Sequence, residues 1–434
     1  MKPLTNLTTF STTLILSSLV PCARGADYPT PGDVVVPPET AAGEALDLSS
    51  REGSLRIAGL DFFPHASSTA LYDDNLLISH TNKLAVNELT FSPGLTIVGG
   101  DVATAFPGSV SLGQLRNLLD NSLLDDASKP QRFIGIDYTP ALNLFVDHNH
   151  YNNVDEFAGL IAGYTFARLT IGVDQDFKNE AEKNNLVGDR VTIWSYDTHL
   201  RSRYEFTDRT SVEMNGNYLK FEYDDQVFQG YQEFRNDDWL NRNFNDKLSA
   251  GLGAAFGYVI PEGNSSQTYQ QALGRAVYKI SGKINLIAKG GVELREYGQG
   301  QTDTVHPAFD VLGLYQPWET TTFSLKAYGR EEPSPSAGAD YTTYGASAGA
   351  RQLLFNCLYA DVNAGYNDVN FISTGPSGGA GRTDNFYFAR LRFDYQLNAH
   401  WTASLFYTHN QNTSTTSEFS YANNIVGARL YWQF

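Results

Sequence analysis

Cysteine, long hydrophobic runs and excess positive charge are all scarce in this sequence. Only Cys22 and Cys357 occur among 434 residues. After the N-terminal leader no run of about 18 apolar residues is found, which excludes a bundle of transmembrane helices. Lys and Arg number 31 against 48 Asp and Glu, for a net charge of -17. This balance argues against nucleic acid as a partner, because phosphate binding needs clustered positive charge.

The first 25 residues have the pattern of a signal peptide. Lys2 precedes an apolar core at 14–20, and small residues suited to cleavage follow at 23–26. Removal of this leader would leave Cys357 as the only cysteine, so no internal disulfide is expected. An alternative in which Cys22 is acylated, as in a lipoprotein, stays open. Residues 26–52 include "YPTPGDVVVPPET" and are interpreted as a proline-rich periplasmic lead-in.

What the sequence does contain, in 53–434, is a long series of alternating segments. Glycine (38), tyrosine (25) and phenylalanine (26) are abundant, and they favour turns and strands. In 133–147 the even positions are apolar and the odd positions are mostly small or polar, as in a strand with one oily face. The same separation, with charges on one side only, recurs at 168–174, 211–218, 284–295 and 387–397.

This alternation fits either a soluble sandwich or a transmembrane barrel. Each segment is long enough to cross a bilayer when tilted, which takes roughly 9 to 11 residues. In lipid only helices and closed barrels satisfy every backbone group. Aromatic residues gather at the segment ends, with Trp318, Trp401 and Trp432 near short turns or the C-terminus and Trp194 and Trp239 near longer loops. Two such belts favour the barrel.

The connections between segments predict the number of strands. Short links at 207–209, 281–283, 316–319, 354–357 and 397–400 alternate with longer polar links at 179–189, 225–236, 331–340, 371–382 and 412–418. The strands can alternate in direction as far as the C-terminal strand only if 237–260 is a hairpin that turns at "NDK", rather than a single strand. We therefore expect an all-β transmembrane antiparallel up-and-down barrel of about 18 strands from near Leu55, or else 16, with a short periplasmic helix at 101–130.

Several of these segments resemble a known family. "LYDDNLLIS" (71–79), "LTFSPGLTIVGGD" (89–101), "IGIDYTPALNLFVDHNHYNNVDEFAG" (134–159), "ARLTIGVDQDF" (167–177) and the aromatic C-terminal end are similar to the putative outer-membrane β-barrel porins of the type-two group of Gram-negative bacteria. The resemblance covers almost all of the mature chain. It implies a barrel of about 18 strands in the bacterial outer membrane, and it implies no particular substrate and no catalytic residues.

Charged residues on the polar side of the segments are the candidate lining of the lumen. They could form opposed ladders that set up a transverse field in a pore, or salt-bridge networks that fill the lumen, and the sequence leaves both open. The predicted lumen-lining residues are Arg201, Arg203, Arg275, Lys279, Lys289, Glu293, Arg295, Lys326, Arg390, Arg392 and Asp394.

Two other patterns could carry chemistry at the outer rim. Acidic pairs at 73–74, 224–225, 237–238 and 331–332 are expected at the outer ends of strands, where their oxygens could hold divalent cations or form a solvated rim. "DHNH" (147–150) offers an acid and histidines, but it lacks partners from other strands, so a rim hydrolase ranks third among the functions considered. No cofactor, no metal site and no catalytic residue is predicted.

The favoured function is a porin-like channel for the passive passage of small polar solutes. The alternative is a non-conducting barrel that assists export or assembly of a surface polysaccharide. Alternate residues at the end of the chain, Val426, Leu430, Trp432 and Phe434, resemble the recognition strand of outer-membrane proteins. The expected partners are outer-membrane lipid and lipopolysaccharide, the barrel assembly machinery and small polar solutes.

Overall fold

A computed structural model gives the fold of this chain. It describes residues 55–101, 115, 132–225, 227–263, 265–298, 303–335, 339–355, 357–373 and 381–433. The leader, the lead-in, most of the expected helix at 101–130 and Phe434 lie outside the described residues. Leu115, the one residue described within 102–131, is helical and fully buried. In the described part of the chain no helix is both long and apolar enough to cross a membrane.

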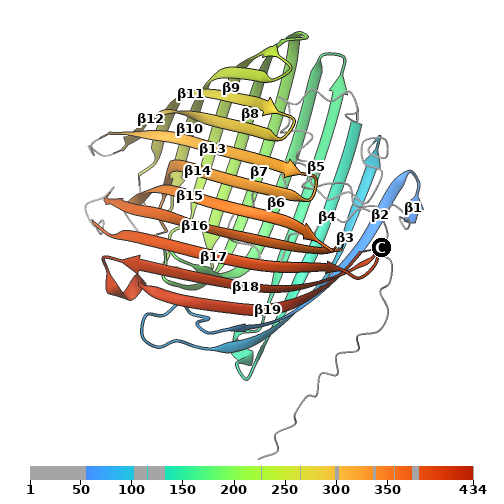
Figure 1. Ribbon diagram of the computed structural model, residues 1–434. Helices are drawn as coiled ribbons and strands as arrows, with labels where there is room; N and C mark the ends of the chain where they lie inside the picture. Colours follow the sequence, from blue (N-terminus) through green and yellow to red (C-terminus); the bar gives the residue numbers. More distant parts are fainter. Residues whose placement is uncertain are drawn as a thin grey trace, which may run out of the picture.

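The chain forms a closed antiparallel barrel of 18 long strands, as the alternation predicts (Figure 1). Each strand pairs with the next, and β19 pairs with β2 to close the ring. The three-residue β1 adds a short hairpin to β2, so the ring itself starts at Leu60 rather than Leu55. The strands are β1 (Leu55–Ile57), β2 (Leu60–Asp73), β3 (Val86–Gly100), β4 (Arg132–Val146), β5 (Asn153–Phe166), β6 (Leu169–Asn184), β7 (Asp189–Thr207), β8 (Thr210–Tyr223), β9 (Tyr231–Asn245), β10 (Leu248–Pro261), β11 (Gln267–Ser281), β12 (Ile284–Tyr297), β13 (Thr304–Trp318), β14 (Thr321–Pro333), β15 (Ala339–Leu354), β16 (Leu358–Ser373), β17 (Thr383–Gln396), β18 (Trp401–Ser414) and β19 (Tyr421–Gln433).

The connections alternate between a short-turn end and a long-loop end. The predicted hairpin at "NDK" is confirmed, since β9 ends at Asn245 and β10 begins at Leu248. Two short 3-10 helices, η1 (Asn149–Tyr151) and η2 (Ser417–Phe419), lie in loops of the other end. In outer-membrane barrels the long loops face outwards and the short turns face the periplasm. We therefore call the end that carries η1 and η2 the outer mouth.

One predicted loop is mostly strand. The segment 179–189, expected as a polar loop, continues β6 to Asn184 and resumes in β7 at Asp189, leaving only four residues for the turn. The sequence here is polar on both faces of the hairpin. This is expected for strands that extend beyond the lipid, because neither face then contacts hydrocarbon. Alternation therefore stops where the membrane stops, while backbone pairing goes on.

Two further expectations about β9 are wrong. The pair Asp237 and Asp238 lies in the middle of β9, not at its outer end. Trp239 is on the inner side and almost fully buried, so it belongs to no interfacial belt. Trp318 and Trp401 do lie at the short-turn end, and Trp401 faces Trp432 with ring centroids 6.4 Å apart. The outer belt thus loses one of its two expected tryptophans.

Candidate pore interior

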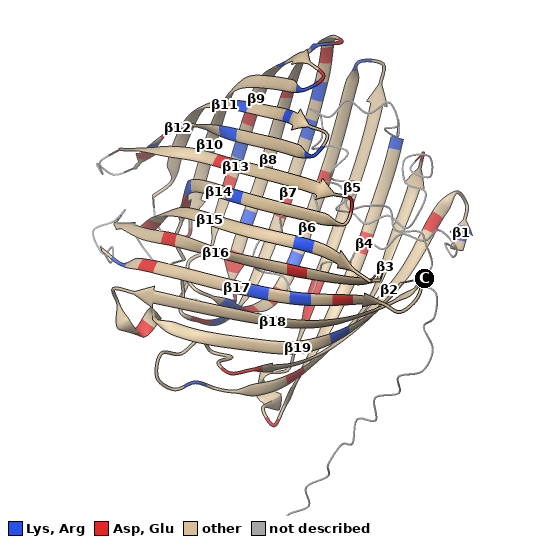
Figure 2. Cartoon of the chain, in the orientation of Figure 1, with Lys and Arg blue, Asp and Glu red and all other residues tan. Residues whose placement is uncertain are grey.

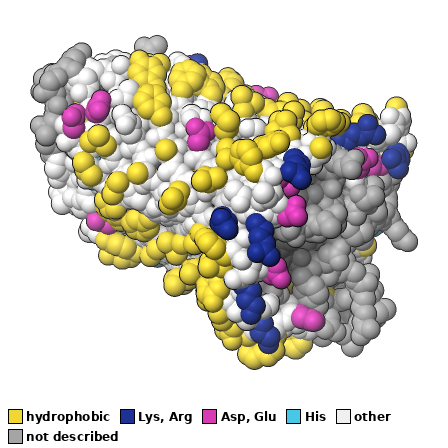
Figure 3. All heavy atoms as spheres, turned by 90° about the horizontal axis from the view of Figure 1, so that it is seen from above, with side chains coloured by type: hydrophobic (Ala, Val, Ile, Leu, Met, Phe, Trp, Pro, Cys, Tyr) yellow, Lys and Arg dark blue, Asp and Glu magenta, His cyan; other side chains and the backbone are white. Residues whose placement is uncertain are grey.

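The two faces of the barrel wall differ in chemistry. On β19, Val426 and Leu430 are exposed on the outer face, while the alternate residues Asn423 and Tyr431 are buried on the inner face. The even apolar positions of 133–147 likewise point outwards, with Ile134, Ile136, Tyr138, Leu142, Leu144 and Val146 exposed. Figure 3 shows hydrophobic side chains spread over much of the outer face in view, with Lys and Arg gathered towards one end. An apolar outer belt of this kind suits contact with lipid.

Charges of both signs lie along the strands as well as in the loops (Figure 2). In the sector β8 to β11, the guanidinium of Arg275 pairs with Glu213 and bonds Asn241 Oδ1 at 2.9 Å through Nε. Arg275 is on β11 and Glu213 on β8, so the contact passes over two strands. Side chains of strands that are not neighbours converge only on the concave face of a barrel. This contact therefore places both residues inside.

A second inner pair lies next to the first. Lys289 Nζ on β12 is 3.3 Å from Asp237 Oδ2 on β9, and Asn215 donates to the same carboxylate at 3.0 Å. Between the two pairs lies the indole of Trp239, with Arg275 Cζ 4.4 Å and Lys289 Nζ 5.1 Å from its ring. A cation over the face of an indole is attracted by the ring quadrupole. The Trp239 ring thus attracts the cations of both Arg275 and Lys289.

A third cluster surrounds Arg295 near the outer mouth. Its guanidinium lies 2.8 Å from Glu293, 3.4 Å from Glu331 and 3.6 Å from Asp340. These carboxylates come from β12, β14 and β15, so the cluster again joins strands that are not neighbours. His306 adds a ring nitrogen 3.1 Å from Glu331. One arginine thus holds together the inner side of four consecutive strands.

Most of the remaining predicted lining residues also lie beside a carboxylate or an aromatic ring, and Lys279 is described by its position alone. Lys279 is half buried on β11 near the short-turn end. The others pair or pack as follows: Arg201 with Asp174; Arg203 with Glu213 at 3.8 Å; Lys326 with Asp310 at 3.4 Å; Arg392 with Asp394 at 3.0 Å; and Arg390 over the Phe388 ring at 5.4 Å. These contacts are ion pairs and ring contacts made by residues of the inner wall, and both readings of the charges, opposed ladders or networks that fill the lumen, remain predictions.

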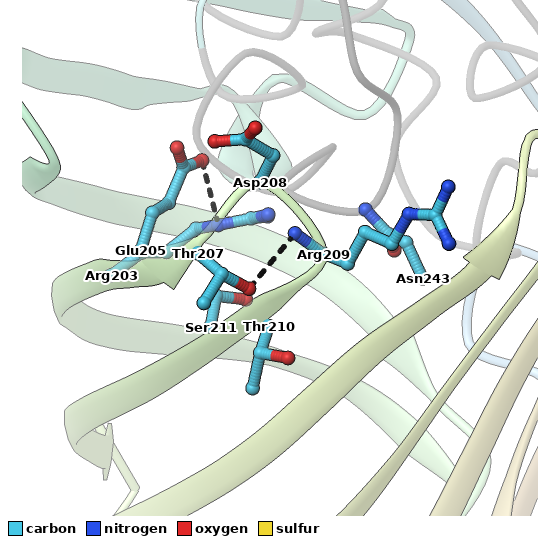
Figure 4. Close-up of a pocket in the computed structure, with 8 residues that line it drawn as sticks. All are labelled: Arg203, Glu205, Thr207, Asp208, Arg209, Thr210, Ser211 and Asn243. Carbon is cyan, nitrogen blue, oxygen red and sulfur yellow. Dashed lines mark hydrogen bonds and ion pairs between the residues drawn. The ribbon is translucent and has the colours of Figure 1, made fainter.

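A small pocket lies at the short-turn end of β7, β8 and β9 (Figure 4). It encloses about 250 Å³ and is lined by Arg203, Glu205, Thr207, Asp208, Arg209, Thr210, Ser211 and Asn243. Arg203 and Glu205 are 3.5 Å apart, and Thr207 Oγ1 accepts a hydrogen bond from the backbone N–H of Arg209. Charges of both signs line it, so it has no preference for one sign of ligand.

The acidic pairs 73–74 and 331–332 at the outer mouth already have protein partners, whereas Asp224 and Asp225 are exposed. Asp73 is buried and pairs with Lys183, while Asp74 accepts hydrogen bonds from Asn424 N and Nδ2 at 2.7 and 2.6 Å. Glu331 belongs to the Arg295 cluster. Among the residues that the structure describes, no group of three or more His, Cys, Asp or Glu side chains is placed to hold a metal ion.

The "DHNH" segment forms the turn around η1. Asp147 adopts a positive φ of 64° and is exposed, and His148 Nδ1 lies 3.4 Å from the backbone oxygen of Val146. His148 and His150 have ring centroids 6.2 Å apart. The segment thus makes a tight exposed turn, and its geometry offers no acid–histidine dyad to support the hydrolase reading.

One set of contacts had no signal in the sequence. Lys183, on the hairpin once expected to be a loop, reaches Asp73 of β2 and Asn423 of β19. Alternation tells which side of a strand a residue occupies, but not which distant strand will face it. Only the polar character of 179–189 on both faces could have indicated a segment outside the lipid.

Comparisons with known proteins give only distant likenesses. No family model and no curated protein matches the chain. Similar solved structures include OccK2 (OpdF) of Pseudomonas aeruginosa in complex with glucuronate (TM-score 0.46, 9% identity, 88% of this chain and 100% of that one), OprD of the same organism (0.44, 9%, 89% and 96%) and OccAB4 of Acinetobacter baumannii (0.44, 11%, 86% and 98%). At this level of similarity they carry no argument about the activity of this chain.

The architecture itself is decisive for the class of protein. A ring of 18 strands leaves no open sheet edge, its outer face is apolar, and its inner face carries paired charges. A soluble protein would bury the apolar face and expose the charged one. The chain therefore has the architecture of a membrane-spanning β-barrel of the outer-membrane type.

Proposed function

We propose that this barrel is a passive, weakly selective channel for small polar solutes. The observation that carries the proposal is the inner wall, where Arg275, Lys289 and Arg295 lie among carboxylates and amides. Eighteen strands spaced by roughly 4.8 Å and tilted by about 40° give a backbone diameter of about 35 Å. Side chains cannot fill a ring of that width, so its polar interior would hold water.

The charge pattern supports weak rather than strong selectivity. Most inner cations have a carboxylate within ion-pair distance, so little unpaired charge of either sign would face a passing solute. Neutral or weakly charged polar molecules would then pass more readily than apolar ones. The protein would need no catalytic group and no cofactor, and it would reach the membrane through the barrel assembly machinery and contact lipopolysaccharide there.

Conductance of the purified protein in planar lipid bilayers tests the proposal. We expect stepwise openings, with a small reversal potential under a salt gradient. Lys289→Glu should move the reversal potential towards cation preference, because it reverses a charge on the inner wall. Lys220→Glu is the matched control, since Lys220 is an outer-facing residue of β8 paired with Glu222 of its own strand.

Complete absence of conductance from correctly folded protein would refute the channel. Equal shifts from Lys289→Glu and Lys220→Glu would show that the measured selectivity does not arise at the inner wall.

A further inference from the structure

The seam that closes the ring is incomplete at its outer end. β2 and β19 lie side by side (Figure 1), but their ladder stops at Asp73 and Ile425. On its other side β19 stays paired with β18 as far as Tyr421. Residues 421–424 of β19 therefore present a strand edge that the ladder of β2 does not cover. Such an edge carries backbone N–H and C=O groups that need partners, and it can pair with another chain.

The loop between β2 and β3 supplies donors to this edge. The backbone oxygen of Asn424 accepts the backbone N–H of Asp74 at 3.1 Å. Two residues earlier in the chain, the backbone oxygen of Ala422 accepts Asn75 Nδ2 at 3.2 Å and Lys83 Nζ at 2.9 Å. Side chains of the loop thus take the place of a paired strand.

The same pattern extends one step beyond β19. The backbone oxygen of Ser420 lies 2.8 Å from His80 Nδ1. Residues 420, 422 and 424 alternate along the chain, and in extended backbone the carbonyl groups of alternate residues point to the same edge. The loop therefore meets this edge at the spacing that a neighbouring strand would have. We call residues 74–83 the seam clasp.

Two buried apolar residues hold the seam clasp on both sides of the seam. Leu76 lies in a cluster with Phe145 of β4, on the side of β2. Ile78 lies in a cluster with Phe386 of β17 and Tyr421 of β19, on the other side. Both anchors are almost fully buried. The clasp therefore joins the two sides of the closure independently of the ladder between β2 and β19.

Asn75 fixes the shape of the clasp. Its side chain is fully buried, with Oδ1 accepting the N–H of Ser79 and Nδ2 donating to the oxygen of Ser79, both at 2.9 Å. In the turn that this closes, Ile78 has a φ of 43°. A β-branched residue rarely adopts that conformation, so its burial must hold it there. The backbone N–H of Asn75 donates to Asp73 Oδ1 at 2.9 Å, and Asn423 Nδ2 of β19 donates to the same oxygen at 2.6 Å. One turn thus bonds to both strands of the seam.

We propose that the seam clasp locks the ring after β19 has paired with β2, and that the folded barrel opens at this seam when the clasp is released. The ladder closes the periplasmic part of the seam, and the clasp replaces the ladder where it stops. Without the clasp the outer edge of β19 would be exposed, and the ladder could separate from that end pair by pair. This inference does not depend on which solutes pass through the lumen.

A single substitution loosens the clasp. Asn75→Ala leaves the buried N–H and C=O of Ser79 without the side chain that satisfies them, and it removes one donor to Ala422. Unfolding of the purified barrel in urea is then followed over time, and folding before the experiment is checked by heat-dependent mobility in gels. We expect Asn75→Ala to unfold about tenfold faster than the wild type.

A second variant removes the clasp altogether, and a third is the matched control. Replacing residues 74–85 by Asn-Gly gives a two-residue turn that suits a hairpin between the register partners Asp73 and Val86. We expect this protein to unfold at least as fast as Asn75→Ala. The control is Asn412→Ala, because Asn412 is a buried asparagine of β18 that donates to Phe419 O within one hairpin and not across the seam.

A covalent bridge locates the effect in the ring. Ala70→Cys with Ala428→Cys places two thiols on register partners of β2 and β19, and Ala276→Cys with Ala288→Cys does the same on β11 and β12. Cys357 is changed to Ser in each protein, and the thiols are joined with a short bifunctional reagent. The seam bridge should return the clasp variants to the unfolding rate of the bridged wild type, whereas the wall bridge should not. Asn412→Ala should gain no more from the seam bridge than the wild type does.

The outcomes are distinct. Faster unfolding of the clasp variants that the seam bridge reverses and the wall bridge does not supports the seam clasp, as does assembly of the shortened protein only when its seam is bridged. Unfolding of Asn75→Ala at the wild-type rate overturns the proposal. Equal recovery from the two bridges also overturns it, because the loop would then add stability without holding the seam.

Discussion

The guanidinium of Arg275 lies 4.4 Å from the centre of the Trp239 ring while the same group pairs with Glu213. Three strands, β8, β9 and β11, thus meet on one inner side chain. The wall is stabilised here by contacts perpendicular to the strands, in addition to the backbone ladder. Arginine suits this position because its planar group can stack and bond at once.

Arg275→Met should therefore destabilise the barrel. It would leave the buried carboxylate of Glu213 with Arg203, 3.8 Å away, as its remaining cation, and it would remove the donor to Asn241 Oδ1. Removing one partner of a buried pair costs about 3–5 kcal/mol, and because Arg275 keeps some exposure we expect the lower end. Urea unfolding in lipid vesicles, followed by tryptophan fluorescence, measures the change.

Arg242→Met is the matched control for that experiment. Arg242 lies on the outer face of β9 and is exposed, with Phe244 as its ring neighbour at 6.0 Å. We expect a change below about 1 kcal/mol there. A similar loss from both variants would show that the inner pair contributes nothing special.

Much of this fold could be predicted from the sequence, because a barrel in lipid forces its chemistry into a period of two. The even positions of 133–147 and the alternate residues Val426, Leu430 and Trp432 point outwards as expected. The turn after Asn245 followed from the parity of the remaining strands. Such features are local or follow from counting, so one sequence suffices to find them.

The two wrong predictions, for Trp239 and for the segment 179–189, have a common physical origin. Trp239 was expected at an interface because tryptophan prefers one, yet it is enclosed between Arg275 and Lys289, which come from other strands. The segment 179–189 was expected to be a loop because it is polar, yet most of it pairs as a β-hairpin and its Leu186 contacts strands halfway round the ring. Both outcomes depend on which residues meet across the interior, and a single sequence does not contain that information.

Asp238 is an exception to the rule that charges face inwards. It lies near the middle of β9 on the outer face, opposite Met214 of β8 and Ala254 of β10 in the register. A carboxylate facing lipid near the bilayer centre costs stability, though less than Arg or Lys, for which the cost is about 2–4 kcal/mol. We expect Asp238→Ala to stabilise the folded barrel by about 1 kcal/mol in the same urea experiment.

The neighbouring Asp237→Ala provides the matched comparison. Asp237 faces inwards and pairs with Lys289, so its removal should destabilise the barrel. Opposite signs for adjacent aspartates would follow directly from the alternation of the strand. If Asp238→Ala also destabilised the protein, the hydrogen bond that Asp238 Oδ1 accepts from Asn236 at 3.3 Å would outweigh the cost of a carboxylate facing lipid.

The seam that closes the ring should be sensitive to acid at Asp74. This residue lies just beyond β2, and its carboxylate accepts two hydrogen bonds from Asn424 of β19. Burial raises the pKa of Asp74, but the hydrogen bonds from Asn424 and the charge of Lys83 outweigh it, so the pKa falls below its usual 3.8. Its contribution to stability is therefore complete above about pH 4 and is lost as the pH falls through the lowered pKa.

Asp74→Asn should remove that part of the acid dependence. We expect the wild type to lose stability more steeply than the variant below pH 4, with a smaller difference in slope at neutral pH. Heat-dependent gel mobility between about pH 2.5 and 7 measures this, because that range extends from below the usual aspartate pKa to neutral pH. Asp225→Asn, in the exposed β8–β9 loop, is the control. Parallel curves for wild type and Asp74→Asn would exclude a role for this carboxylate in closure.

The last prediction concerns a glycine that one aromatic ring covers. Gly257 of β10 is the register partner of Tyr269 of β11, and a Cβ at Gly257 would overlap the tyrosine ring. Tyr269 is itself almost fully buried and donates its hydroxyl to Glu233, so it has little freedom to move away. Overpacking of this kind costs about 1–3 kcal/mol. We expect Gly257→Ala to lower stability by that amount, whereas Gly313→Ala, where the nearest heavy atom lies 3.9 Å from the added Cβ, should change it little. Equal stability of the two variants in urea would mean that the tyrosine ring can shift without loss.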